Sequence, residues 1–290
     1  GTLYYSHLFF RGRRFYWDNC FSLTASMLSG LLAVLAVPSI LNVLISSRRS
    51  SSLYTSYKRY LSTVLHTNTW FEHELKPGTT SWKSLYTVRS RHLRAGMASK
   101  LQGLGVVSQR DIALTQFGFV GFMMLKPDKF GVRQIQEFDW EAYNHTWAVI
   151  GHMIGLQDRY NLCRKTVDET RQVCQAVLDR VYTPCLENVP EYFEYMSRVM
   201  LESMWCVNPT INIESFLYQV KYLANVPGYI YTESDRLELQ RKIREQLKGK
   251  SIDTGKNTIW TQTHTSAFII LVWIVGLFND SSEKIWFQSK

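Results

Sequence analysis

The sequence lacks the short motifs that mark the commonest catalytic and metal-binding sites. It contains no glycine-rich phosphate loop, no nucleophile elbow and no His-Glu-x-x-His zinc helix. Its five cysteines form no Cys-x-x-Cys or Cys-x-x-Cys-His pattern, which argues against a structural zinc and against a covalently attached c-type haem. An odd number of cysteines in so long a chain favours reduced thiols inside a core.

Strand-like alternation of apolar and polar residues is also missing, as are internal repeats, low-complexity tracts and a clear linker. Apolar residues make up 46% of the chain, which is enough to build a core and argues against wholesale disorder. We therefore expect an all-α protein whose residues 1–290 form a single domain.

Acidic residues are fewer than basic ones, which leaves a net charge of +9. Nucleic acid, anionic lipid and anionic ligands all suit that sign. Because no zinc-finger spacing or ribonucleoprotein signature is present, no nucleic-acid partner is expected. The basic groups at 11–14 and 48–59 flank a long apolar stretch, which favours a lipid surface or haem propionates.

That apolar stretch, residues 21–47, carries no charge and is long enough to span a bilayer. Pro38 interrupts it, so two buried helical pieces are expected, with a spanning helix as the alternative. Residues 266–278 are apolar but short, which fits either a core helix or a tail that enters a membrane interface. No signal peptide is visible at the start of the sequence.

Helical periodicity predicts the remaining elements. Ser108 and Asp111 have the spacing of a helix N-cap, and the uncharged helix that follows, 112–125, should be central. The other predicted helices are 50–65, 82–100, 140–156, 166–181, 190–205, 211–224 and the strongly charged 234–248, which precedes a loop at 248–257.

Among the seven histidines, His92 has the most suggestive surroundings. It lies on a predicted helix, with Arg89 one turn earlier on the same face. Haem needs an imidazole for its iron, cations for its propionates and an apolar wall for its ring, which helix 112–125 could supply. The plainer interpretation is that a lone histidine is structural or exposed.

Several segments, in order, resemble a known family. They are Arg59-Tyr60-Leu61-Ser62-Thr63, Val88-Arg89-Ser90-Arg91-His92, the run from Ser108 to Phe117 and the run from Glu141 to Gly155. The sequence is similar to the family that joins the bacterial latex-clearing protein, a rubber oxygenase, to the endoplasmic-reticulum-bound oxygenase of mycophenolic-acid biosynthesis. The resemblance runs from about residue 11 to 163, and the helical part from about 165 is matched less well.

The resemblance implies a globin-like helical core around a b-type haem, with additional helices. It implies that His92 is the axial ligand of the iron and that Arg89 helps to bind the cofactor. It also places Arg59 and Thr63 on the distal side as catalytic residues that donate hydrogen bonds to dioxygen. The alternatives are that Arg59 pairs with a surface carboxylate and that Thr63 caps a helix.

Two positions depart from the family pattern. Ser62 stands where the latex-clearing protein has a lysine that can cap the iron, so a closed, lysine-ligated state is not expected. The stretch around residues 42–44 has no counterpart of the glutamate proposed as a base, which puts rubber cleavage by proton abstraction in doubt. We expect Asp111 to be a helix cap, and His145 and His152 to be satisfied core residues, with His152 near the haem helix.

The resulting functional expectation is a haem b-dependent oxygenase that uses O2 on a long apolar substrate, either an isoprenoid or an unsaturated lipid, by oxidative cleavage of a carbon–carbon double bond. A non-catalytic carrier or sensor that binds haem or lipid at a membrane is the alternative, and a cofactor-free structural membrane protein is a third. Association with the endoplasmic-reticulum membrane is expected by resemblance, and no redox partner is identified.

Overall fold

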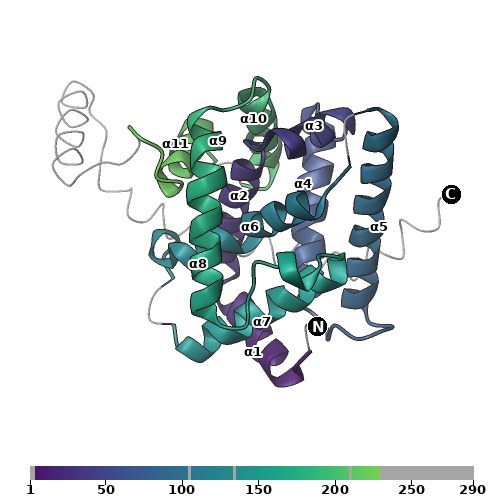
Figure 1. Ribbon diagram of the computed structural model, residues 1–290, viewed down its shortest axis with the longest axis vertical. Coiled ribbons are helices and arrows are strands. Elements are labelled where there is room, and N and C mark those ends of the chain that lie inside the picture. Colours follow the sequence, from purple (N-terminus) through teal and green to yellow (C-terminus); the bar gives the residue numbers. More distant parts are fainter. Residues whose placement is uncertain (1–3, 104–105, 133–134, 209–210, 229–290) are drawn as a thin grey trace. The chain divides into compact units, whose positions relative to one another are not determined.

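The computed structural model describes residues 4–103, 106–132, 135–208 and 211–228, and all regular elements within them are helical (Figure 1). The helices are α1 (Ser6–Asp18), α2 (Cys20–Val34), α3 (Pro38–Ser46), α4 (Leu53–Trp70), α5 (Thr80–Leu101), α6 (Gln109–Leu125), α7 (Glu137–Ile154), α8 (Val167–Val177), α9 (Thr183–Glu187), α10 (Phe193–Ser203) and α11 (Ile213–Leu223). Shorter turns are η1 (Pro127–Phe130), η2 (Asp158–Tyr160), η3 (Leu178–Tyr182) and η4 (Met204–Cys206). Residues up to 204 and 211–229 belong to one compact unit, which is the subject of this account.

The all-α prediction is confirmed, and each helix predicted within the described residues is present with ends shifted by a few positions. The segment predicted as 166–181 passes through the π-helical turn η3 and continues into α9. The predictions at 234–248, 248–257 and 266–278 lie outside the described residues.

Helices α2 and α6 cross at the centre of this unit, as expected from the uncharged residues 112–125 of α6. Their backbones come so close at Gly30 and Gly118 that a Cβ atom on Gly30 would lie 2.0 Å from the Gly118 carbonyl oxygen. Only glycine permits that approach. The predicted cap of α6 is confirmed, because the Ser108 Oγ accepts from the Asp111 N–H (3.1 Å) and the Asp111 Oδ2 accepts from the Ser108 N–H (2.9 Å).

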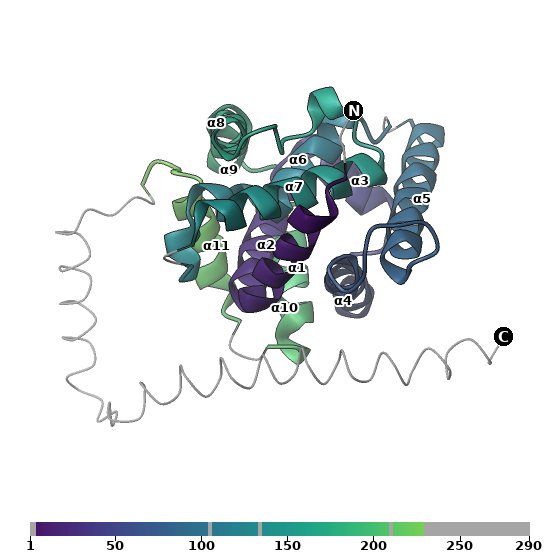
Figure 2. The same cartoon turned by 90° about the horizontal axis from the view of Figure 1, so that it is seen from below.

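Helix α1 was not predicted, because its cluster of arginines reads as a basic segment rather than as half of an amphipathic helix. It packs along α7, and the two lie side by side in Figures 1 and 2. Gly12 lets them touch, since a Cβ there would meet the Thr146 hydroxyl at 2.3 Å and the Ala142 carbonyl oxygen at 2.7 Å. The arginines of α1 remain at its surface while Phe9 and Phe15 are buried.

The uncharged stretch 21–47 forms α2 and α3, which meet at an angle of 92° just before Pro38. The break predicted at this proline is confirmed, although α3 is only partly buried. In the described part of the chain, no single helix is long and apolar enough to cross a bilayer. Taken together, α2 and α3 have the required length and composition, but they form a bent pair.

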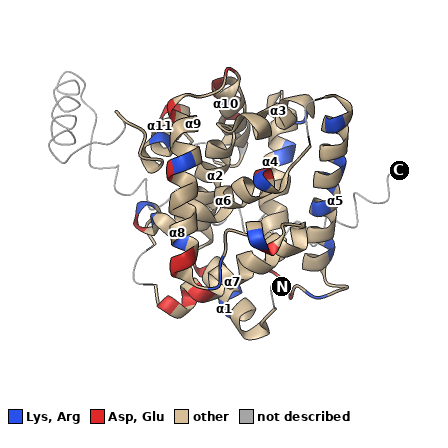
Figure 3. Ribbon diagram, in the orientation of Figure 1, with Lys and Arg blue, Asp and Glu red and all other residues tan. Residues whose placement is uncertain are grey.

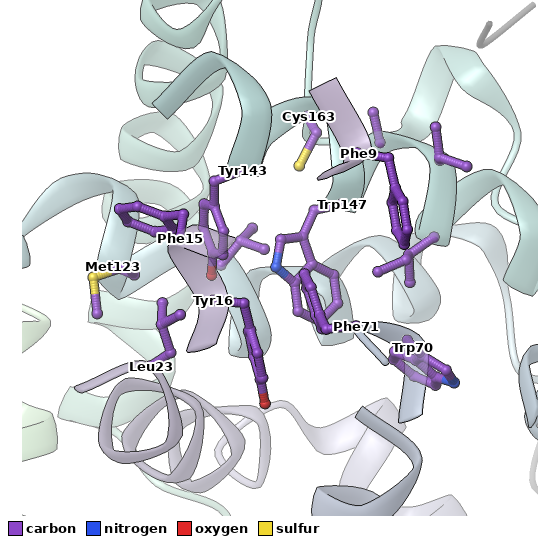
Figure 4. Packing of buried hydrophobic residues seen from close by; sticks show 14 of the residues in the cluster. Phe9, Phe15, Tyr16, Leu23, Trp70, Phe71, Met123, Tyr143, Trp147 and Cys163 are labelled. Carbon is purple, nitrogen blue, oxygen red and sulfur yellow. The ribbon is translucent and has the colours of Figure 1, made fainter. Parts of the chain in front are cut away.

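An aromatic cluster fills the space between α1, α4, α6 and α7 (Figure 4). The Tyr16 and Phe71 rings stack with centroids 3.9 Å apart, and Trp147 meets Trp70 edge-on at 6.2 Å. The four cysteines with described side chains are free, and Cys163 and Cys174 are buried, as expected for reduced thiols. These contacts bring the end of α4 against α7.

We predict that Gly30→Ala destabilises the protein by about 2–3 kcal/mol, because the added methyl group must separate the backbones of α2 and α6. Gly96→Ala is the matched control within a helix. Its Cβ would meet Val107 at an ordinary 3.4 Å, and alanine is the better helix former. Urea unfolding of the two variants measures this. Equal unfolding midpoints would show that the close approach of α2 and α6 does not determine the stability of the protein.

Candidate functional site

All four predicted site residues lie on one pair of antiparallel helices, α4 and α5, which run next to each other in Figures 1 and 2. Arg59 and Thr63 are on α4, and Arg89 and His92 are on α5. Ser52 and Thr55 form a capping box at the start of α4, and the Thr79 hydroxyl accepts from the Trp82 N–H at the start of α5 (3.2 Å). Local capping therefore fixes where both helices begin.

The imidazole of His92 lies inside this pair. Its Nδ1 is shielded from solvent and has no hydrogen-bond partner among the described residues. Burial, reinforced by the positive charge of Arg59, lowers the pKa of His92 to about 4. The ring is therefore neutral at pH 7, which is the form that can donate a nitrogen lone pair to a metal ion.

Arg59 is the charged residue that affects the pKa of His92. Its guanidinium makes no hydrogen bond or salt bridge within the described part of the chain. Burial lowers the pKa of Arg59, but a guanidinium remains protonated at any physiological pH. No acidic residue is among the charges that shift the pKa of either group. Among the described residues, Arg59 therefore does not pair with a surface carboxylate.

Thr63 and Arg89 are each engaged elsewhere. The Thr63 hydroxyl donates to the Arg59 carbonyl oxygen one turn earlier on α4 (3.0 Å), so it is neither a helix cap nor a free donor. Arg89 is exposed and donates to the Met153 carbonyl oxygen (3.4 Å), beside Gly155 at the end of α7. A cation there is favoured by the dipole of α7. Arg59 thus lies close enough to His92 to lower the pKa of that ring, whereas the Arg89 guanidinium binds the C-terminal end of α7.

A line of hydrogen bonds between α4 and α5 was missed from the sequence. The Arg91 guanidinium donates to the Ser62 Oγ (3.3 Å) and to the His66 Nε2 (3.1 Å). Since that nitrogen accepts, the His66 Nδ1 carries the proton and donates to the Ser84 Oγ (2.7 Å). Trp70 also donates to this hydroxyl (3.0 Å). The spacing of Ser62, His66 and Trp70 on one helix face was the available signal.

An apolar wall lies beside these polar groups. Trp70, Phe119 and Trp147 form a cluster of rings with centroids between 5.3 and 6.5 Å apart, and Val88, one turn before His92, packs against the same core. One unpaired imidazole, one uncompensated cation and an apolar wall are what a non-covalent haem requires. Within the described residues, no group of three or more His, Cys, Asp or Glu side chains could hold a metal ion.

The expectations for the other candidate residues have mixed outcomes. Asp111 is a helix cap, as predicted, and also accepts from the Ser39 hydroxyl (2.7 Å). His145 is half-buried and satisfied by the Tyr5 N–H (3.1 Å). His152 is not a core residue, because it is exposed and its Nδ1 lies 3.0 Å from an Asp158 oxygen. The inward-facing residue next to it is Gly151, where a Cβ would clash with the Gln116 amide.

Comparison with known proteins identifies the family of this chain. Residues 13–229 match the sequence model of the family described as ER-bound oxygenase mpaB/B'/Rubber oxygenase, catalytic domain. The chain belongs to this family. The resemblance found in the short motifs of α4 to α7 is therefore confirmed, and the match extends beyond residue 163 into α11.

Two individual relatives share only part of their length or a low sequence identity with this chain. The rubber oxygenase of Streptomyces sp. (strain K30) is 35% identical over 95 residues, which are 33% of this chain and 21% of that protein. The structure of latex clearing protein in its closed state superposes with a TM-score of 0.65 at 19% identity, covering 94% of this chain and 76% of that one. The aligned part of the chain spans about a fifth of the curated relative, while the structural likeness establishes the fold.

The half-buried His66 predicts a pH dependence of stability. Burial, followed by the charge of Arg91, lowers the pKa of His66 to about 4. Between pH 6.5 and 4 the unfolded chain holds more protons, so stability falls as the pH falls. From pH 7 to 5 this residue should cost less than about 2 kcal/mol, because solvent reaches the half-buried ring and screens its interactions.

We expect His66→Gln to reduce the loss of urea stability between pH 7 and pH 5, with the exposed His152→Gln as the control. An unchanged pH dependence in His66→Gln would show that His66 is not buried as a neutral ring.

Proposed function

We propose that this protein is a haem b-dependent oxygenase that acts with O2 on a long apolar substrate, such as an isoprenoid or an unsaturated lipid. The observation that carries this proposal is the neutral, unpaired imidazole of His92 beside the uncompensated guanidinium of Arg59, between two helices of an oxygenase-family fold. Haem bound there would supply the iron centre for dioxygen chemistry.

His92 would hold the iron. A neutral ring nitrogen without a protein partner can make a metal bond without first breaking a hydrogen bond. Residue Val88 and the nearby tryptophans would exclude water from the same side. The depressed pKa of His92 keeps the imidazole unprotonated down to about pH 4, so acid would not compete for the ring over the physiological range.

Arg59 would supply the positive charge of the site, since it lies close enough to His92 to lower the pKa of that ring. Its fixed positive charge has no counterion in the described residues, so it can donate hydrogen bonds to an oxygen atom that gains negative charge during the reaction. Thr63 would join it only by exchanging its present bond to the Arg59 carbonyl oxygen, because a hydroxyl has a single proton to donate. We therefore assign Arg59 the larger catalytic role. Arg89 would contact a propionate only after releasing the Met153 carbonyl oxygen at the end of α7.

The proton chemistry must differ from a route that uses a carboxylate base. The side chains of α3 around Asn42 carry no carboxylate, and Ser62 is bound to Arg91. No acidic residue shifts the pKa of Arg59 or of His92. Oxidative cleavage of a double bond without that base is the reaction we propose, at or near an endoplasmic-reticulum membrane where long apolar substrates are found.

The same lack of a nearby acid favours one alternative of another class, a haem or lipid carrier that does not turn over. Product analysis with O2 and polyisoprene, terpenoid or unsaturated-lipid substrates separates the two. Loaded protein that yields no product from any of them supports the carrier.

We predict that His92→Ala abolishes the imidazole-type Soret band on addition of haem, because no other described histidine is buried and unpaired. His152→Ala, which removes an exposed histidine, should bind haem as the parent does. A titration followed by absorption measures both, and an unaltered spectrum for His92→Ala would refute the assignment of the ligand.

Arg59→Gln should retain haem and lower turnover by on the order of 10²–10³, the usual cost of one donor that stabilises developing negative charge. Thr63→Val should cost much less, since its hydroxyl serves the helix backbone. Product formation per haem under O2 is the measurement, and equal losses in the two variants would contradict this division of roles.

A further inference from the structure

The outer face of α5 is unusually apolar for a surface helix. Tyr86, Leu93, Met97 and Leu101 lie on one side of the helix and are 62%, 62%, 69% and 89% exposed. Trp82 stacks on Tyr86 with ring centroids 5.9 Å apart. In Figures 1 and 2, α5 lies at the edge of the unit, and no other described helix covers its outer side. Contiguous exposed apolar side chains of this kind mark an interaction surface.

This face is also basic. From Lys76 to Arg110 the sequence has no Asp or Glu, and Figure 3 shows basic but no acidic positions along α5. Lys83, Arg94 and Lys100 are exposed and make no salt bridge with any described residue. Aromatic and aliphatic side chains with flanking cations are the composition of a helix that lies in the interface of an anionic bilayer.

An open hollow lies on the same face. It is lined by Tyr86, Thr87, Ser90, Leu93 and Arg94. The Thr87 hydroxyl donates to the Lys83 carbonyl oxygen (2.9 Å), which leaves the Ser90 hydroxyl and the Arg94 guanidinium as donors. These two groups beside apolar side chains match the phosphate and the adjoining acyl chain of a phospholipid.

We propose that the α5 face, made of Tyr86, Leu93, Met97 and Leu101 with Lys83, Arg94 and Lys100, docks on the surface of an anionic phospholipid bilayer. The role of this docking face rests on the proposed function, because His92 lies on the inner side of the same helix. A lipid surface held against α5 would present long apolar substrates next to the candidate site.

The positive charge of the α5 face disfavours two other binding partners, a second copy of the chain and the chain's own C-terminal residues. A second copy placed symmetrically on this face would oppose the same unpaired cations. Residues 229–290 of this chain contain an apolar stretch, but they also carry more Lys and Arg than Asp and Glu. An anionic membrane is the partner that complements both the apolar and the basic components.

The test is flotation of the full chain with vesicles of phosphatidylcholine alone or with one quarter phosphatidylserine. We expect binding to the anionic vesicles, weakening as salt is raised from 50 to 300 mM. The variant K83Q/R94Q/K100Q should bind on the order of 100-fold more weakly, since each cation near such a surface contributes about five-fold. The control R14Q/K165Q/R180Q removes the same charge from exposed positions outside α5.

The apolar component is tested by L93N/M97N, which keeps the charge and should lower binding at least about ten-fold. Its control, F10N/Y192N, changes two exposed apolar residues away from α5. Losses of similar size in variants and controls would overturn the proposal. So would a monomer–dimer shift in L93N/M97N without vesicles, or a lowered melting temperature that reveals cover by the chain's own tail.

Vesicle binding needs neither haem nor turnover, so its outcome is separate from that of the proposed function. His92→Ala should float with anionic vesicles as the parent does. If it binds haem poorly and vesicles well, the iron ligand and the docking face are independent properties of α5. If the parent fails to float while it still binds haem, docking fails alone.

Discussion

The juxtaposition of Arg59 and His92 is the constraint on which the candidate site depends. A buried cation is costly unless something neutralises it, and no acidic group in the described residues does so. The imidazole responds by staying neutral, which leaves a ring nitrogen without a partner. Two groups that would repel each other if both were charged are therefore held together, and an anionic or metal-containing ligand is what would relieve the mismatch.

Much of this arrangement could be predicted from sequence, because it rests on local rules. Helix periodicity and the Ser108–Asp111 cap gave α6, and the ordered motifs pointed to the α4–α5 pair. The missed features depend on contacts between distant segments. Helix α1 packs closely along α7 only because Gly12 has no side chain, and the approach of Gly30 to Gly118 cannot be seen in either helix alone.

The roles of individual polar residues were harder to predict than their positions. Arg89 shares a helix face with His92, yet its guanidinium is taken by the end of α7. His152 lies on a helix with many buried residues, yet it is exposed, because Gly151 and not His152 faces Gln116. Spacing assigns a residue to a face of its helix, but only the neighbouring helices decide whether that side chain meets a backbone carbonyl, a carboxylate or solvent.

The polar contacts between α4 and α5 explain how one helix can serve both a buried site and an exposed surface. Ser84 and Arg91 are bound to His66, so α5 cannot rotate about its axis without breaking those bonds. A rotation of one residue would move every side chain by about 100°. It would carry His92 toward solvent and bring Leu93 toward α4. The hydrogen bonds of His66 thus keep the iron-binding candidate inside and the apolar face outside, although His66 itself belongs to neither.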